Sequence, residues 1–439
     1  MAVDSEQLVL AAREGATDEL TELLNEGADP NKTDNTGNVA LIEASSRGHL
    51  ETVRLLLLRG ADLTTQNKEG DTALIRAAAH DHVEVIDLLL ANRADPNVQN
   101  NEGGTALHCA AWCGHSETTR FLLANGADPN IQDKDGGTTL LWAVQRNNME
   151  VIALLLTKGA DPNVQNNKGD AALIEASRRG NMETVRLLLQ RGADPNIRNK
   201  FGYTALLLTA KDGRVETTRL LLDNGANPNL WRGDGDTALI LAAIYSRMEV
   251  INLLLAYRAD PNVQNNEGST ALHWAAWRGH SEIARSLLDN EADPNVLDNR
   301  GRAPLIEASS EGHLEIVRLL LQRGADLTIQ NRDGETALIW AAKNAYVGVV
   351  NLLLTNRADP YATDKQGRTA LSRATRNGHD AVVNALLHVH AEHFNHYSDI
   401  PRTLVGGDPF DRMTERKRRI EKEKVEGWIM KKACISEAM

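Results

Sequence analysis

The stretch Asn265-Asn266-Glu267-Gly268-Ser269-Thr270-Ala271-Leu272-His273 contains the signals that decide the fold. An Asn or Asp shortly before a glycine favours a tight turn with positive φ, and Thr270 stands where a following helix needs an N-cap. Ala275-Ala276 and then Gly279 come next, so we expect a short first helix that ends at this glycine. A second apolar segment leads to Ala292-Asp293-Pro294-Asn295. The stretch therefore predicts a turn followed by two helices.

The glycine of this turn recurs every 33 residues through most of the chain, and we call these residues the marker glycines. They are Gly37, Gly70, Gly103, Gly136, Gly169, Gly202, Gly235, Gly268, Gly301, Gly334 and Gly367. One such unit cannot bury its own apolar face, so stability must come from stacking neighbouring units. Paired alanines allow first helices to approach closely, and Leu-rich second helices supply the larger core residues.

This register resembles the ankyrin-repeat family over about 390 residues. The resemblance implies an all-α repeat solenoid of about 12 helix-turn-helix units with short β-hairpin tips. The Thr-Pro-Leu-His signature typical of that family mostly becomes Thr-Ala-Leu-Ile here. Its histidine is kept only at His108 and His273, and its proline only at Pro304.

The repeat signals divide the chain into two parts. Residues 1–391 are expected to form the solenoid, with an N-terminal cap at 4–33, repeats at 34–363 and a C-terminal cap repeat at 364–391. Residues 392–439 are predicted to be a polar, charged tail that is partly helical or disordered. Its segment Arg412–Lys432 indicates an exposed charged helix. The alternatives are a nuclear import signal at Arg416–Arg419 or a partner-helix site anchored by Trp428, Ile429 and Met430.

Composition limits the classes of partner. Residues 1–391 hold 38 Lys and Arg against 51 Asp and Glu, and such an acidic body disfavours nucleic acid. No stretch approaches the length of a membrane helix, and the start carries Asp4 and Glu6 where a secretory signal would carry basic residues. The 3 cysteines are too few for a disulfide framework. We expect a monomer that is cytoplasmic or nuclear and is not inserted in a membrane.

Three units lack glycine at the ends of both helices. Arg93, Arg258 and Arg357 replace the glycine after the second helix, and the same units carry Asp81, Ser246 and Ala345 after the first. Each lost left-handed glycine costs on the order of 1 kcal/mol, so these units are predicted to be the least stable ones.

The family resemblance implies that partners bind the concave row of first helices and the hairpin tips. Residues six, nine and ten positions after the marker glycines include many of the aromatic and basic types that are enriched at binding hot spots. The predicted site comprises Trp112, Trp142, Arg146, Arg178, Arg179, Lys211, Tyr245, Trp274, Trp277, Arg278, Trp340 and Arg376. Acidic residues flank many marker glycines, which predicts acidic tips beside a basic inner face. An acidic peptide with apolar anchors would suit that face.

Two clusters contain potential zinc ligands. His108, Cys109, Cys113 and His115 are close in sequence, but the register gives both histidines structural positions at a helix start and a turn. The second cluster, His388, His390, His393 and His396, would spread around a helix rather than converge on one point. We expect no metal site and no cofactor, and no catalytic motif is recognisable.

The leading hypothesis is a non-catalytic adaptor or scaffold for protein partners. The alternative is the recognition or regulatory portion of a larger enzyme or membrane protein whose effector domain is not in this chain. A weaker possibility, implied by the family resemblance, is asparaginyl hydroxylation at residues such as Asn97 and Asn262, although the proline before each departs from the usual valine.

Overall fold

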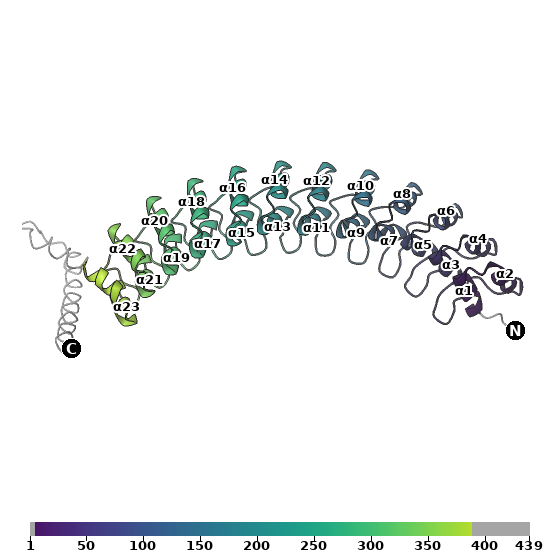
Figure 1. Cartoon of the computed structure of the whole chain (residues 1–439), viewed down its shortest axis with the longest axis horizontal. Helices are drawn as coiled ribbons and strands as arrows, with labels where there is room; N and C mark the ends of the chain where they lie inside the picture. Colours follow the sequence, from purple (N-terminus) through teal and green to yellow (C-terminus); the bar gives the residue numbers. More distant parts are fainter. Residues whose placement is uncertain (1–4, 389–439) are drawn as a thin grey trace, which may run out of the picture.

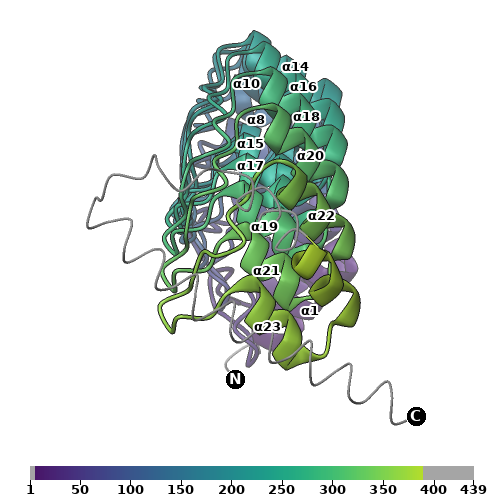
Figure 2. The same ribbon diagram turned by 90° about the vertical axis from the view of Figure 1, so that its left-hand side faces the viewer.

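The computed structural model describes residues 5–388, which form one curved stack of helix pairs (Figure 1). The described residues contain 24 helices, or twelve pairs, counting the helical residues 380–388. The first helix of each pair lies on the concave side of the arc and the second on the convex side, and the turns that carry the marker glycines project beyond the first helices (Figures 1 and 2). This arrangement confirms the predicted all-α solenoid.

We call the first helices the inner row and the second helices the outer row. The inner row comprises α1 (Ser5–Glu14), α3 (Ala40–Arg47), α5 (Ala73–Ala79), α7 (Ala106–Cys113), α9 (Thr139–Arg146), α11 (Ala172–Arg179), α13 (Ala205–Asp212), α15 (Ala238–Ile244), α17 (Ala271–Arg278), α19 (Pro304–Glu311), α21 (Ala337–Lys343) and α23 (Ala370–Asn377). The outer row comprises α2 (Thr17–Asn25), α4 (Leu50–Leu58), α6 (Val83–Ala91), α8 (Ser116–Ala124), α10 (Met149–Thr157), α12 (Met182–Gln190), α14 (Val215–Asp223), α16 (Met248–Ala256), α18 (Ser281–Asp289), α20 (Leu314–Gln322), α22 (Val347–Thr355) and residues 380–388.

The inner helices begin and end where the sequence predicts. The Thr72 hydroxyl accepts a hydrogen bond from the Ile75 amide at 3.3 Å, which caps α5, and Thr270 forms a capping box with His273 at the start of α17. Gly279 ends α17 with φ +80°, a conformation that glycine adopts without steric cost. The paired alanines Ala275 and Ala276 are fully buried between neighbouring helices.

Asparagine side chains in the loops that follow the outer helices connect successive units. Asn163 Nδ2 donates to the Gly192 carbonyl at 3.1 Å, and Asn163 Oδ1 accepts from the Asp194 amide at 2.8 Å. Asn97 makes the same two bonds, so both ends of its amide are engaged within the fold. The recurring Asp-Pro-Asn motif therefore provides hydrogen bonds between units.

The tips are tight turns whose neighbours are hydrogen-bonded to one another. The Asn266 amide donates to the Asp234 carbonyl of the preceding tip at 2.9 Å, and equivalent bonds recur along the stack. Within residues 5–388, extended pairing is limited to isolated antiparallel bridges such as Thr33 with Val39. The predicted hairpins are thus present as short turns without continuous strands.

Eight residues other than glycine have positive φ in the described part of the chain. They include the three pairs that the sequence indicated, for example Asp81 at +61° and Arg93 at +70°. Asn147 at +57° and Glu291 at +68° adopt the same conformation, and the sequence reasoning missed them. The backbone at these sites keeps the left-handed form of the repeat even where the residue disfavours it.

Several predicted features lie outside the described residues. They are the tail at 392–439 with Arg416–Arg419 and Trp428, and the histidines His390, His393 and His396. Within the described part, no helix has the length and apolar character needed to cross a membrane.

Candidate functional site

The inner face is the exposed side of the inner helices, and its central column lies six residues after each marker glycine. The column is only partly accessible: Trp142, Trp274 and Trp340 are half-buried, whereas Glu175 and Glu307 are buried. Because successive inner helices pack closely through alanines, the aromatic rings of neighbouring units lie near one another.

A first aromatic cluster joins α7 and α9. The rings of Trp112 and Trp142 meet edge to face with their centroids 5.4 Å apart, and the Arg146 guanidinium lies 4.6 Å from the centre of the Trp112 ring. The buried His108 ring lies 5.3 Å from Trp142 on the other side. Three predicted site residues from two neighbouring units therefore form one group.

A second cluster of the same residue types lies within the single helix α17. Trp274 and Trp277 meet edge to face at 5.7 Å, and the Arg278 guanidinium lies 4.8 Å from the Trp277 ring centre. Both clusters combine an edge-to-face tryptophan pair with an arginine over an exposed ring, and such cation–π contacts leave the outward N–H groups of the guanidinium available.

Two further cation–aromatic pairs occur on the inner face. Lys211 lies 5.6 Å from the Tyr245 ring centre, and Lys343 lies 4.0 Å from that of Trp340. Within residues 5–388, none of Arg146, Lys211, Arg278 and Lys343 has a carboxylate partner. These four cations keep their charge uncompensated at short range.

Ion pairs compensate the positive charge in the middle of the inner face. Arg178 pairs with Asp170 at 2.9 Å and also with Glu175, and Arg179 pairs with Glu175 at 2.5 Å. These two arginines neutralise carboxylates that the fold buries, so little of their charge is left for a partner. Arg376 is exposed on α23, away from the aromatic clusters.

The acidic residues at the tips fall into an exposed set and a buried set. Residues just before the marker glycines, such as Glu69 and Glu267, are exposed. Those just after them are buried and paired with arginines, as Asp236 is with Arg232 at 2.7 Å. The other buried members are Asp71, Asp170 and Glu335. Only the first set can present negative charge to a partner.

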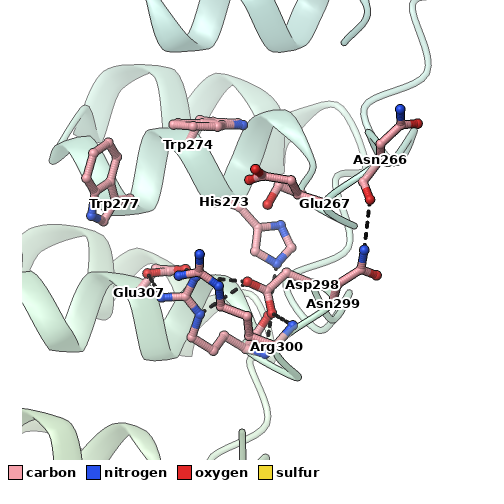
Figure 3. A pocket seen from close by; sticks show the side chains of 11 residues that line it. Asn266, Glu267, His273, Trp274, Trp277, Asp298, Asn299, Arg300 and Glu307 are labelled. Carbon is pink, nitrogen blue, oxygen red and sulfur yellow. Dashed lines mark hydrogen bonds and ion pairs between the residues drawn. The ribbon is translucent and has the colours of Figure 1, made fainter. Parts of the chain in front are cut away.

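A pocket of about 400 Å³ lies between the units of α17 and α19 (Figure 3). Trp274 and Trp277 of α17 form one side of it (Figure 3), and Arg302 is among its other lining residues. Arg302 bridges Asp298 at 3.0 Å and Glu307 at 2.8 Å. Burial of the carboxyl raises the pKa of Glu307 to about 7, although the Arg302 charge opposes this rise. The sequence reasoning missed Arg302, even though an arginine beside a marker glycine was a visible signal.

The suspected zinc ligands have structural roles. His108 Nδ1 contacts the Thr105 hydroxyl at 2.9 Å in a capping box, and His108 Nε2 contacts the Gly137 carbonyl at 3.3 Å. Burial raises the pKa of the Cys109 thiol to about 12, which disfavours the thiolate that metals bind. His115 Nε2 contacts the Ala79 carbonyl at 3.2 Å. Both histidines thus occupy the helix-start and turn positions that the register predicted.

Comparison with known families identifies this architecture. The family model described as ankyrin repeats (3 copies) matches six overlapping segments. They are residues 8–100, 57–133, 107–199, 173–265, 248–331 and 324–397. No curated protein matches the sequence. Because the matched segments span nearly all of the repeat region, the chain belongs to the ankyrin-repeat family.

Proposed function

We propose that this chain is a non-catalytic adaptor or scaffold that holds protein partners against its inner face. Ankyrin repeats are generally protein–protein interaction modules, and proteins built from them are typically non-catalytic. The adaptor role goes further than that general property, and the inner-face chemistry supports it.

The observation that carries the proposal is the row of cations over aromatic rings, formed by Arg146, Lys211, Arg278 and Lys343. Each combines a partly accessible aromatic ring with an uncompensated positive charge, and Trp, Tyr and Arg are the residue types enriched at binding hot spots. We therefore propose as partner a protein segment with acidic residues beside apolar anchors. Arg178 and Arg179 are outside this row, because they pair with the buried carboxylates of Asp170 and Glu175.

The size and rigidity of the array also suit this role. A stable interface buries about 1,200 to 2,000 Å² in total, more than one unit can offer. Because the helices are already ordered by their neighbours, little conformational entropy is lost when a partner binds across several units. The proposed contact region runs from α7 to α21.

The test compares two double variants with the same change in net charge. Arg146→Glu/Arg278→Glu reverses one cation in each aromatic cluster, and Arg59→Glu/Lys158→Glu reverses two exposed cations that follow outer helices. Each protein is used for affinity purification from cell lysate with isotope-labelled quantification, after circular dichroism shows unchanged helix content.

We expect at least one partner whose recovery falls about tenfold with the inner-face variant Arg146→Glu/Arg278→Glu. Recovery of the same partner should be unchanged with the outer control. Equal recovery by both variants would remove the inner face from consideration. Equal loss by both would indicate a non-specific effect of net charge and would contradict the proposal as well.

A further inference from the structure

The hairpin tips in the middle of the array differ from those on either side. The residue before the marker glycine is an exposed acid at six tips, namely Glu69, Glu102, Asp135, Asp234, Glu267 and Asp333. At the tip before α13 this residue is Phe201, which is 64% exposed, and Trp231 beside the next tip is 49% exposed. Both are more accessible than Trp277 on the inner face, at 42%. Exposed aromatic rings of this size commonly mark interaction sites.

Uncompensated positive charge surrounds these rings. The Arg198 guanidinium lies 5.4 Å from the Trp231 ring centre, and its Nη2 donates to the Trp231 carbonyl at 2.6 Å. Lys168 and Lys200 are exposed on adjacent tips, joined by a 3.0 Å bond from the Lys200 amide to the Lys168 carbonyl. In the part of the chain that the structure describes, these three cations have no carboxylate partner.

A hollow lies next to Phe201 because a side chain is missing. The other tips carry a longer side chain two residues before the marker glycine, for example Asn299, whose Nδ2 donates to the preceding tip at 2.8 Å, but here the residue is Gly233. The Gly233 amide still donates to the Phe201 carbonyl at 3.2 Å, so the turn is kept without the covering side chain. The hollow measures about 550 Å³. It is lined by Arg198, Asn199, Lys200, Phe201, Gly202 and Gly233.

We infer that this central tip patch, defined as Lys168, Arg198, Lys200, Phe201 and Trp231, binds an acidic protein segment that carries an apolar side chain. The apolar side chain packs in the hollow against Phe201, and flanking carboxylates pair with the three cations. Exposed acids on the flanking tips, Asp135 on one side and Asp234 and Glu267 on the other, repel the same segment and so fix its position along the array.

The charge pattern favours a protein segment over a nucleic acid. A nucleic-acid strand running along the tips would place phosphates against Asp135 and Glu267, whereas a short acidic segment can end between them. The tips form a ridge beside the helix rows in Figure 2, so the patch is separate from the inner face and does not depend on the function proposed for it.

The experiment uses the full chain and a phage-displayed library of random 12-residue peptides. Phage that bind the variant Phe201→Ala/Trp231→Ala are removed first. The remaining phage are then selected for binding to the wild-type protein. Peptides that emerge are synthesised, and their affinities are measured by fluorescence anisotropy. Lys200→Glu is the second patch variant, and Arg300→Glu, an exposed cation on another tip, is its matched control. The variant Arg146→Glu/Arg278→Glu separates this site from the inner face.

We expect peptides in which Asp or Glu flank an aromatic or aliphatic residue. Their affinity should fall at least about tenfold in both patch variants and stay within about twofold in Arg300→Glu and in the inner-face variant. Selection of no patch-dependent peptide, or of basic ones, would overturn the inference. A 20-nucleotide oligothymidylate that binds the wild type and is lost in the patch variants would overturn it in favour of nucleic acid.

Discussion

The indole Nε1 of Trp142 donates a hydrogen bond to Oδ2 of Asp133 at 2.7 Å. Oδ1 of the same carboxylate accepts from the Gly137 amide at 2.7 Å, so one aspartate satisfies both the turn and the inner-face tryptophan. Asn265 stands nine residues before Trp274 just as Asp133 stands before Trp142. The single side-chain oxygen of Asn265 accepts hydrogen bonds from the Glu267 and Ser269 amides of the turn. The buried Nε1 of Trp274 has no hydrogen-bond partner in the described structure.

This difference predicts that the same substitution destabilises the two sites to different extents. Trp142→Phe removes a hydrogen-bonded donor and leaves Asp133 Oδ2 without that partner. This substitution should therefore lower the free energy of unfolding by about 1–2 kcal/mol more than Trp274→Phe does. Trp274→Phe removes an unsatisfied buried donor, which offsets its lost packing. Urea unfolding of both variants would check this, and equal losses would contradict it.

The non-glycine residues with positive φ predict where the array opens first. Ala345→Gly at φ +65° and Arg357→Gly at φ +69° should each stabilise their unit by about 1 kcal/mol. Gly225→Ala is the converse control, because its φ is +84° and an added Cβ meets nothing within 4 Å. In hydrogen exchange, the units that contain Arg93, Arg258 and Arg357 should exchange faster than their neighbours. Equal protection across all units would refute the argument.

The fold could be predicted almost completely because its signals are local and repeated. A threonine cap such as Thr72 and a terminal glycine such as Gly279 set helix ends within a few residues, and the 33-residue register fixes which helices are neighbours. The missed left-handed residues, Asn147 and Glu291, occur in units that lack only one of the two glycines. A unit-by-unit alignment of both glycine positions would have found them.

The site was less predictable because side-chain pairing depends on neighbouring units. Residue type alone predicted the same role for Arg178 and Arg146. In the described residues, Arg178 pairs with Asp170 and Glu175, whereas Arg146 lies over the Trp112 ring and pairs with no carboxylate. Likewise, Asp236 is at a tip in sequence but is buried against Arg232. Such pairing depends on the length and conformation of the arginine side chain and on the burial of the carboxylate. The repeat register specifies neither.

The carboxyl of Glu307 predicts a pH dependence of stability. Its pKa of about 7 in the folded chain exceeds the usual 4.5, so the folded state binds this proton more tightly than the unfolded state. Its contribution therefore favours folding at low pH and is lost as pH rises from about 4.5 to 7. A pKa difference of one between the two states is equivalent to about 1.36 kcal/mol, so the free energy of unfolding should change by about 2–3 kcal/mol across this range.

Glu307→Gln should remove this dependence while keeping the side-chain volume. Urea midpoints at pH 5 and pH 8 measure the effect. The variant should gain stability relative to the wild type at pH 8 and lose that advantage at pH 5. A constant difference between the two proteins at both pH values would show that Glu307 titrates in its ordinary range.

The asparagine links between units predict a reciprocal pair of substitutions. Asn163 bonds across a unit boundary to the Gly192 carbonyl and the Asp194 amide. In the described part of the chain, the Thr328 hydroxyl at the equivalent place bonds within its own loop instead, to Asp326 at 2.7 Å. Thr328→Asn should add the missing link between the units of α20 and α22 and stabilise the array by about 1 kcal/mol. Asn163→Thr should weaken its boundary by about 1–3 kcal/mol, because two backbone groups lose their partner. Hydrogen exchange of the backbone amides in α12 and α22 measures the stability at each boundary separately. We expect slower exchange in α22 of Thr328→Asn and faster exchange in α12 of Asn163→Thr. If only the second effect appears, Thr328 already holds its boundary by packing, and the asparagine is dispensable there.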